Sequence, residues 1–126
     1  MQTDKNSDAI ETLEIEVCEE RRDSPRYAID LFVLLPGSPT LCRKPGDISL
    51  GGVFVETLDP VAKGERFSVL VLLPGSPNWI ESEVEVLGFN SSGRRGLHCC
   101  FNEMDFFGQR LLARWLDTMH VLRQVA

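Results

Sequence analysis

The sequence predicts a small antiparallel β-barrel of six strands, closed by one C-terminal α-helix. Two observations carry this prediction. Short apolar or alternating segments are separated by turn signals about every ten residues, which is typical of barrels and sandwiches. Near the C-terminus the apolar spacing changes to threes and fours, which indicates a helix. The length of 126 residues indicates a single domain with one core.

The strands are expected where apolar segments lie between Pro, Gly and Asn turns. The first covers Tyr27 to Leu35, and Thr40 to Cys42 follows as a short strand. The sequence KPGD at residues 44–47 is then expected to turn the chain. Four further strands are expected at residues 53–57, 67–73, 79–89 and 96–101. The segment 79–89 alternates cleanly, which predicts a half-buried strand with a solvated acidic face.

The hexapeptide LLPGSP occurs twice, beginning at Leu34 and at Leu72. The residues that follow the two copies do not match, which argues against an internal repeat. Pro and Gly supply turn geometry wherever strands reverse. We therefore expect two hairpin turns of similar chemistry.

The expected helix carries an apolar stripe at spacings of three and four residues, which we expect to cover the core of the barrel. Asn102 is expected to cap this helix, with Asp105 as its capping-box partner. Arg110 and Arg114 are expected on the exposed side. The stripe consists of Met104, Phe107, Leu111, Trp115, Met119 and Leu122.

Charge is spread unevenly along the chain. Residues 1–20 contain seven acidic residues and one lysine, which accounts for the whole net charge of -6. We therefore expect a partly disordered acidic arm at residues 1–20, followed by a domain at residues 21–126. The alternating segment from Ile10 to Val17 is expected to be a short strand or a partly ordered part of the arm.

The neutral body argues against nucleic acid as a partner. Duplex DNA is usually bound by a broad basic face, and single strands by aromatic side chains along a basic groove. The chain has one tyrosine and no excess of basic residues. We expect neither DNA nor RNA to bind.

Nothing in the sequence suggests export, membrane insertion or catalysis. The N-terminus has no apolar segment typical of a signal peptide, and no apolar run approaches the ~20 residues of a membrane helix. A cytoplasmic protein is therefore expected. The two histidines, His98 and His120, have no catalytic partners in sight, and no zinc spacing is present. The cysteines are expected to be reduced and mostly buried: Cys18, Cys42, Cys99 and Cys100.

Two short stretches carry candidate binding residues. Arg22 and Arg26 form an R-x-x-x-R pattern, with Arg21 directly before it. Arginine forks match phosphate oxygens and the O6 and N7 atoms of guanine. The other interpretation is a solvated loop tethered to Glu19 and Glu20.

The second stretch is GDISLGG, where Asp47, Ser49 and Gly52 fall at D-x-S-x-x-G spacing. On a strand, the side chains of Asp47 and Ser49 would point to the same face. A carboxylate can accept hydrogen bonds from the N1–H and N2–H₂ groups of guanine, and Gly51 and Gly52 allow close approach of backbone to a flat ligand. Each pattern is common by itself, but together they suit a guanine nucleotide that carries phosphates.

The stretch ERRDSPR followed by GDISLGG resembles the two signatures of PilZ domains, which are six-stranded barrels that bind cyclic di-GMP. RRGLHCCFNEMD is similar to the last strand of that family running into its helix. The resemblance implies that Arg22 and Arg26 grip phosphates and guanine edges, while Asp47, Ser49 and Gly52 hold a guanine. Arg21 resembles the arrangement that favours an intercalated dimer of the ligand over a single molecule.

The function that follows is a receptor for cyclic di-GMP, without catalysis, cofactor or metal. Ligand binding would order the loop from Arg21 to Arg26 and move the acidic arm, which is a common kind of switch. An effector protein that controls motility, pili, exopolysaccharide or virulence would then read this change. The alternative is a PilZ-like adaptor that binds a protein partner and works without nucleotide.

Overall fold

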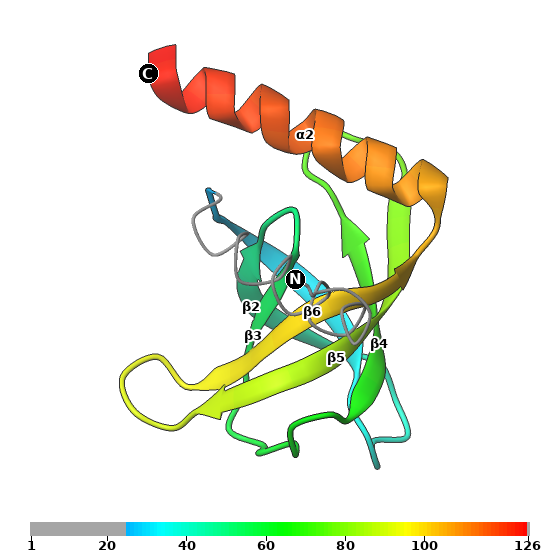
Figure 1. Ribbon diagram of the computed structural model, residues 1–126, viewed down its shortest axis with the longest axis vertical. Helices are drawn as coiled ribbons and strands as arrows, with labels where there is room; N and C mark the ends of the chain where they lie inside the picture. Colours follow the sequence, from blue (N-terminus) through cyan, green and yellow to red (C-terminus); the bar gives the residue numbers. More distant parts are fainter. Residues whose placement is uncertain (1–24, 126) are drawn as a thin grey trace, which may run out of the picture.

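A computed structural model describes residues 25–125 of the chain. The acidic arm, the segment from Ile10 to Val17, and both Arg21 and Arg22 lie outside these residues. In the described region six antiparallel strands form a closed barrel, and helix α2 lies across one end of it (Figure 1). The predicted fold class is confirmed. The elements are β1 (Tyr27–Leu34), β2 (Cys42–Ile48), β3 (Gly52–Glu56), β4 (Arg66–Leu72), β5 (Trp79–Asn90), β6 (Gly96–Met104) and α2 (Phe106–Val125).

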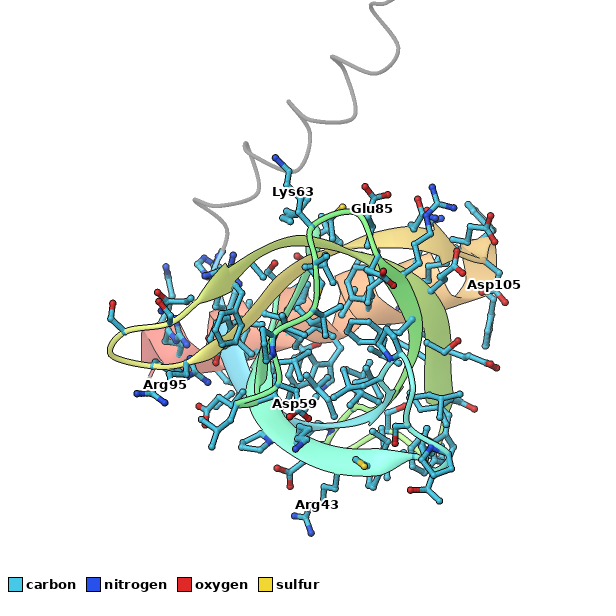
Figure 2. All side chains as sticks on the ribbon, turned by 90° about the horizontal axis from the view of Figure 1, so that it is seen from below. Arg43, Asp59, Lys63, Glu85, Arg95 and Asp105 are labelled. Carbon is cyan, nitrogen blue, oxygen red and sulfur yellow. The ribbon has the colours of Figure 1, made fainter. Side chains whose placement is uncertain are left out.

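The strands follow one another around the barrel in the order β1-β2-β3-β6-β5-β4, after which β4 pairs with β1 again. Alternate residues of each strand point inward, and their side chains fill the interior (Figure 2). Branched aliphatic residues dominate this core. The fully buried ones include Leu31, Val33, Ile48, Val55, Val69, Val71, Val84 and Leu97.

Both PGSP segments form hairpin turns, as predicted. In the first, Gly37 has a φ of 83°, and the Ser38 N–H donates to the carbonyl of Leu35 at 3.0 Å. The second copy repeats this geometry, with Gly75 at a φ of 85°. A glycine is needed there because the position after proline has a positive φ in such turns.

The predicted turn at residues 44–47 is wrong, because these residues lie inside β2. Strand β2 pairs with β1 from Cys42 to Ile48 but with β3 only from Gly46 onward. Pro45 therefore lies outside the segment that pairs with β3. A proline at such an edge costs no ladder hydrogen bond, because its missing N–H has no partner strand on that side.

The predicted cap of the helix is also wrong. Strand β6 continues to Met104, so Asn102 lies within the strand, where its side-chain amide donates to Glu83 at 3.2 Å. Asp105 is the capping residue, because its Oδ1 accepts the N–H of Gly108 at 2.6 Å.

Only part of the predicted apolar stripe of α2 faces the core. Leu111 and Trp115 pack against the core, and Leu112, which was not in the predicted stripe, is only 1% exposed. Phe107 and Leu122 are instead 63% and 52% exposed. Helix α2 lies across one end of the barrel (Figure 1), so only the side of the helix that faces the barrel is covered, and that side runs through Leu111, Leu112 and Trp115.

Arg110 and Arg114 of α2 face solvent, as predicted. The helix is held to the barrel by Trp115, whose indole N–H donates to the carbonyl of Pro74 at 2.8 Å. In the described part of the chain, no helix combines the length and the apolar character needed to cross a membrane.

Candidate functional site

Three side chains form a row across the outer face of β2, β3 and β6. The strand register pairs Asp47 with Phe54, and Phe54 with His98. The neighbours of Phe54 on β3 point into the core, so its ring lies on the opposite, outer side. The ring is nevertheless buried, because His98 lies on it with ring centroids 4.9 Å apart, and Arg94 lies over it. The outer face thus carries an aromatic surface beside a carboxylate.

Arg94 ties this row together from the turn between β5 and β6. Its Nη1 donates to Oδ2 of Asp47 at 2.7 Å, and its Nε donates to Glu56. Its guanidinium carbon lies 4.7 Å from the centroid of the Phe54 ring, within the range of a cation–π interaction. The hydrogen bond to Asp47 raises the pKa of Arg94, and the one to Glu56 adds to it, against the opposing effect of burial.

Arg94, Phe54 and Glu56 were not among the site residues predicted from the sequence. Arg94 belongs to the stretch RRGLHCCFNEMD, which resembled the family only in general terms. The one signal available was an arginine at the tip of a hairpin, which by itself indicates only a solvated turn.

The pairing of β1 with β2 brings the two sequence motifs together. Ala28 lies opposite Asp47, and Tyr27 lies opposite Ile48, so Arg26 comes next to the end of β2. Arg26 is exposed. Burial lowers the pKa of His98, and the positive charge of Arg26 lowers it further. Arg26 and Asp47, about twenty positions apart in the sequence, therefore lie near the same face of the barrel.

The C-terminal helix fixes the start of β1. The side chain of Arg123 donates to the carbonyl of Arg26 at 3.2 Å, and its guanidinium lies 4.3 Å from the centroid of the Tyr27 ring. The same ring meets Trp115 edge-on at 5.8 Å. The position of Arg26 is thus coupled to the last turns of α2.

Ser49 and Gly52 lie in and beside the β2–β3 turn. Ser49 follows the end of β2 and is 2% exposed, whereas Asp47 is partly exposed. Its N–H donates to the carbonyl of Gly52 at 3.0 Å, and its hydroxyl reaches the same oxygen at 3.5 Å. Both the backbone and the side chain of Ser49 thus contact Gly52 across the turn, and the predicted contact of Ser49 with a ligand stays a prediction.

Gly52 has a structural reason to be glycine. A Cβ at this position would lie 2.0 Å from the carbonyl oxygen of Cys99 and 2.9 Å from the Cα of Cys100, so β3 and β6 could not pair as closely.

The thiol of Cys99 is buried, and burial followed by the charge of Cys100 raises its pKa to about 12. Residues 25–125 contain no group of histidine, cysteine or acidic side chains that could hold a metal ion.

Solved structures of other proteins share this fold, among them the following two. The Bacillus subtilis inhibitor of motility, MotI or DgrA, superposes with a TM-score of 0.65 and 22% identity, over 80% of this chain and 52% of its own. This chain therefore spans about half the length of MotI. A pathogenic protein from Xanthomonas campestris, a tetrameric PilZ domain self-assembled through an unusual helical bundle, superposes with a TM-score of 0.66 and 14% identity. The match covers 91% of this chain and 99% of that protein.

The comparison with curated proteins found no match. The sequence model of the PilZ domain matches residues 20–118, which include both motifs, all six described strands and most of α2. On this match, together with the closed barrel and its covering helix, the chain belongs to the PilZ domain family.

Proposed function

We propose that this protein is a receptor for cyclic di-GMP that has no catalytic activity and signals to a protein partner. The observation that carries the proposal is the pairing of β1 with β2, which places Arg26 of the first motif two residues before Ala28, the partner of Asp47 of the second motif. Proteins with this domain typically act as receptors or adaptors. The outer face around Asp47 also offers the aromatic ring of Phe54.

The proposed contacts follow from donor and acceptor chemistry. The Asp47 carboxylate accepts from N1–H and N2–H₂ of one guanine, while Arg22 and Arg26 bind the phosphates and the opposite guanine edge. Ser49 and Gly52 shape the turn that holds Asp47 at the end of β2. Arg21 would add the contacts that favour an intercalated ligand dimer.

Binding would require an exchange of partners at Asp47. In the structure this carboxylate is bound by Arg94, so guanine would replace the guanidinium. Arg123 hydrogen-bonds the backbone of Arg26, so a movement of Arg26 on ligand binding would also move the last turns of α2. This gives the receptor a route to change its surface when the ligand binds.

The process under control is proposed from the relatives. One is an inhibitor of motility and the other a pathogenic protein. Control of motility or virulence, alongside pili and exopolysaccharide, is therefore the proposed output, through an effector protein.

A nucleotide-independent adaptor is the second candidate. It is favoured by the contacts of Arg94 with Asp47 and Glu56, which satisfy both carboxylates without any ligand. In that case the barrel would serve only as a scaffold for a protein partner.

Calorimetric titration of cyclic di-GMP separates the two candidates. The receptor predicts binding that Arg22→Ala weakens by about 2 kcal/mol or more, the usual size of a charged hydrogen bond. Arg114→Ala, which removes an exposed arginine on α2, is the matched control and should bind as wild type. Two ligands per chain would support the role of Arg21. A folded protein that shows no heat and no thermal shift would favour the adaptor.

A further inference from the structure

Part of the outer face of β1, β4 and β5 is apolar, where the solvated face of a sheet usually carries polar side chains. Leu34, Leu72 and Trp79 are 41%, 40% and 51% exposed. Phe32 and Leu70 are half-buried between them. The register sets Phe32 opposite Leu70, and Leu72 opposite Trp79. These five residues, with Trp79 packed edge-on against Phe32 at 5.6 Å, form one continuous area that we name the outer apolar patch.

Acidic side chains border the outer apolar patch. Glu81 lies directly opposite Leu70 on the neighbouring strand, and Glu83 lies opposite Glu103. Like charges that face each other across two strands are destabilising. The nearest cation to Glu83 is Arg66, at 3.8 Å and half exposed, and within residues 25–125 no ion pair is made by Glu81 or Glu103. The fold thus keeps unneutralised negative charge beside exposed apolar surface.

A hollow of about 450 Å³ extends this surface toward the start of α2. Its walls combine the same acids with exposed aromatic rings, and Phe107, at 63% exposed, forms its far side. Single apolar residues on a surface need no explanation, but a contiguous patch with a polar rim is typical of an interaction site. The lining includes Trp79, Glu81, Glu83, Glu103, Asp105 and Phe107.

The five residues of the outer apolar patch lie on other strands than the row of Asp47, Phe54 and His98. Around the closed barrel, β4, β1 and β5 are neighbours, and β2, β3 and β6 make up the other half. The row of Asp47, Phe54 and His98 belongs to that other half. A macromolecule on the outer apolar patch would therefore leave the nucleotide site open.

We propose that the outer apolar patch and its acidic border dock a segment of a partner protein that presents apolar side chains flanked by lysine or arginine. Burial of Trp79, Phe32 and Leu70 would supply the centre of such an interface, since aromatic anchors dominate binding energies. Cations of the partner would neutralise Glu81 and Glu103, and could lie on the exposed aromatic faces.

Charge argues against the other occupants. In a symmetric contact between two copies the same patch meets itself, which would bring Glu81 and Glu83 against acids of the second copy. Residues 1–20 of this chain, with seven acids and one base, would meet the same repulsion. The proposal deepens the proposed function by giving the effector a docking face, but its test uses no nucleotide, so the two can fail separately.

The test uses two fluorescent synthetic peptides of equal length, one built of leucine and lysine and the other of leucine and glutamate. In fluorescence anisotropy the lysine peptide should bind, more weakly as salt is raised, while the glutamate peptide should not bind. Trp79→Ser, Leu70→Ser and Glu81→Lys should each weaken binding by about tenfold or more. Circular dichroism checks that each variant is folded.

Matched controls lie in the loop between β3 and β4. Leu58→Ser removes a leucine that is 71% exposed, and Asp59→Lys makes the same change of charge as Glu81→Lys. Asp59 lies at the end of the barrel opposite α2 (Figure 2), so both controls should bind as wild type. The proposal is overturned if neither peptide binds, if both bind equally, or if the controls lose as much affinity. It is also overturned if sedimentation shows a dimer that Trp79→Ser dissociates.

Discussion

Arg94 donates from Nη1 to Oδ2 of Asp47 at 2.7 Å, so the carboxylate that we assign to guanine is already occupied by a planar cation. The guanidinium also lies on the ring of Phe54, where a flat ligand could stack. An edge of N–H donors on a planar group is what guanine itself would offer. Arg94 therefore occupies the hydrogen-bonding and stacking position of the proposed ligand, and ligand and side chain compete.

Removal of Arg94 should tighten binding of cyclic di-GMP. The ion pair is partly exposed, with Arg94 44% and Asp47 18% exposed, so its contribution is on the order of 0.2–1 kcal/mol and the gain is up to about fivefold. Calorimetry of Arg94→Ala measures it. Arg95→Ala is the matched control, since this exposed neighbour carries the same charge on the same turn (Figure 2). Weaker binding in Arg94→Ala alone would show that Arg94 contacts the ligand.

The charge of Arg26 should be visible in the titration of His98. Arg26→Ala removes the second cause of the lowered pKa and leaves burial, so the pKa of His98 should rise part of the way toward its ordinary value. An NMR titration of the ring protons measures this, with His120→Gln used to assign the two signals. Arg114→Ala should leave the His98 curve in place. An unchanged curve in Arg26→Ala would mean that Arg26 does not lie beside the site.

The stability of the fold should decrease in mild acid because of His98. Its pKa is lowered in the folded chain, so as pH falls the unfolded chain binds the proton first. The stability linked to His98 is therefore complete above the ordinary histidine pKa of about 6.5 and is lost as pH falls through that value to the folded pKa. Urea unfolding at a series of pH values measures the loss.

In His98→Gln the free energy of unfolding should fall less across this pH range than in wild type. His120→Gln, an exposed position on α2, should keep the wild-type decrease. If both variants and wild type lost stability in parallel, the pH dependence would come from groups other than His98.

The fold class could be predicted because its signals are local. Alternation along 79–89 and the two PGSP turns depend on neighbouring residues only, and the structure confirms them. The errors arose where a distant strand decides the outcome. Pro45 is tolerated inside β2 because β3 pairs only from Gly46 onward, and no local pattern shows where a partner strand ends.

In the candidate site too, local motifs predicted some residues, while others depend on strand pairing. Asp47 and Arg26 were found from short motifs, and their proximity followed only once β1 and β2 were seen to pair. Phe54 and Arg94 were missed because they lie on β3 and in the β5–β6 turn. The pairing of β3 with β6 depends on the order of strands around the barrel, which no local sequence pattern reveals.

Gly52→Ala should destabilise the barrel rather than act on the ligand. The added methyl would lie 2.0 Å from the carbonyl oxygen of Cys99, and backbone on both sides prevents an easy shift. Overpacking of this kind costs about 1–3 kcal/mol or more in the free energy of unfolding, which urea denaturation measures. Gly88→Ala is the matched control, because a Cβ on this β5 glycine meets nothing within 4 Å. A folded Gly52→Ala protein with wild-type stability and no binding of cyclic di-GMP would instead assign the motif glycine to close approach of the ligand.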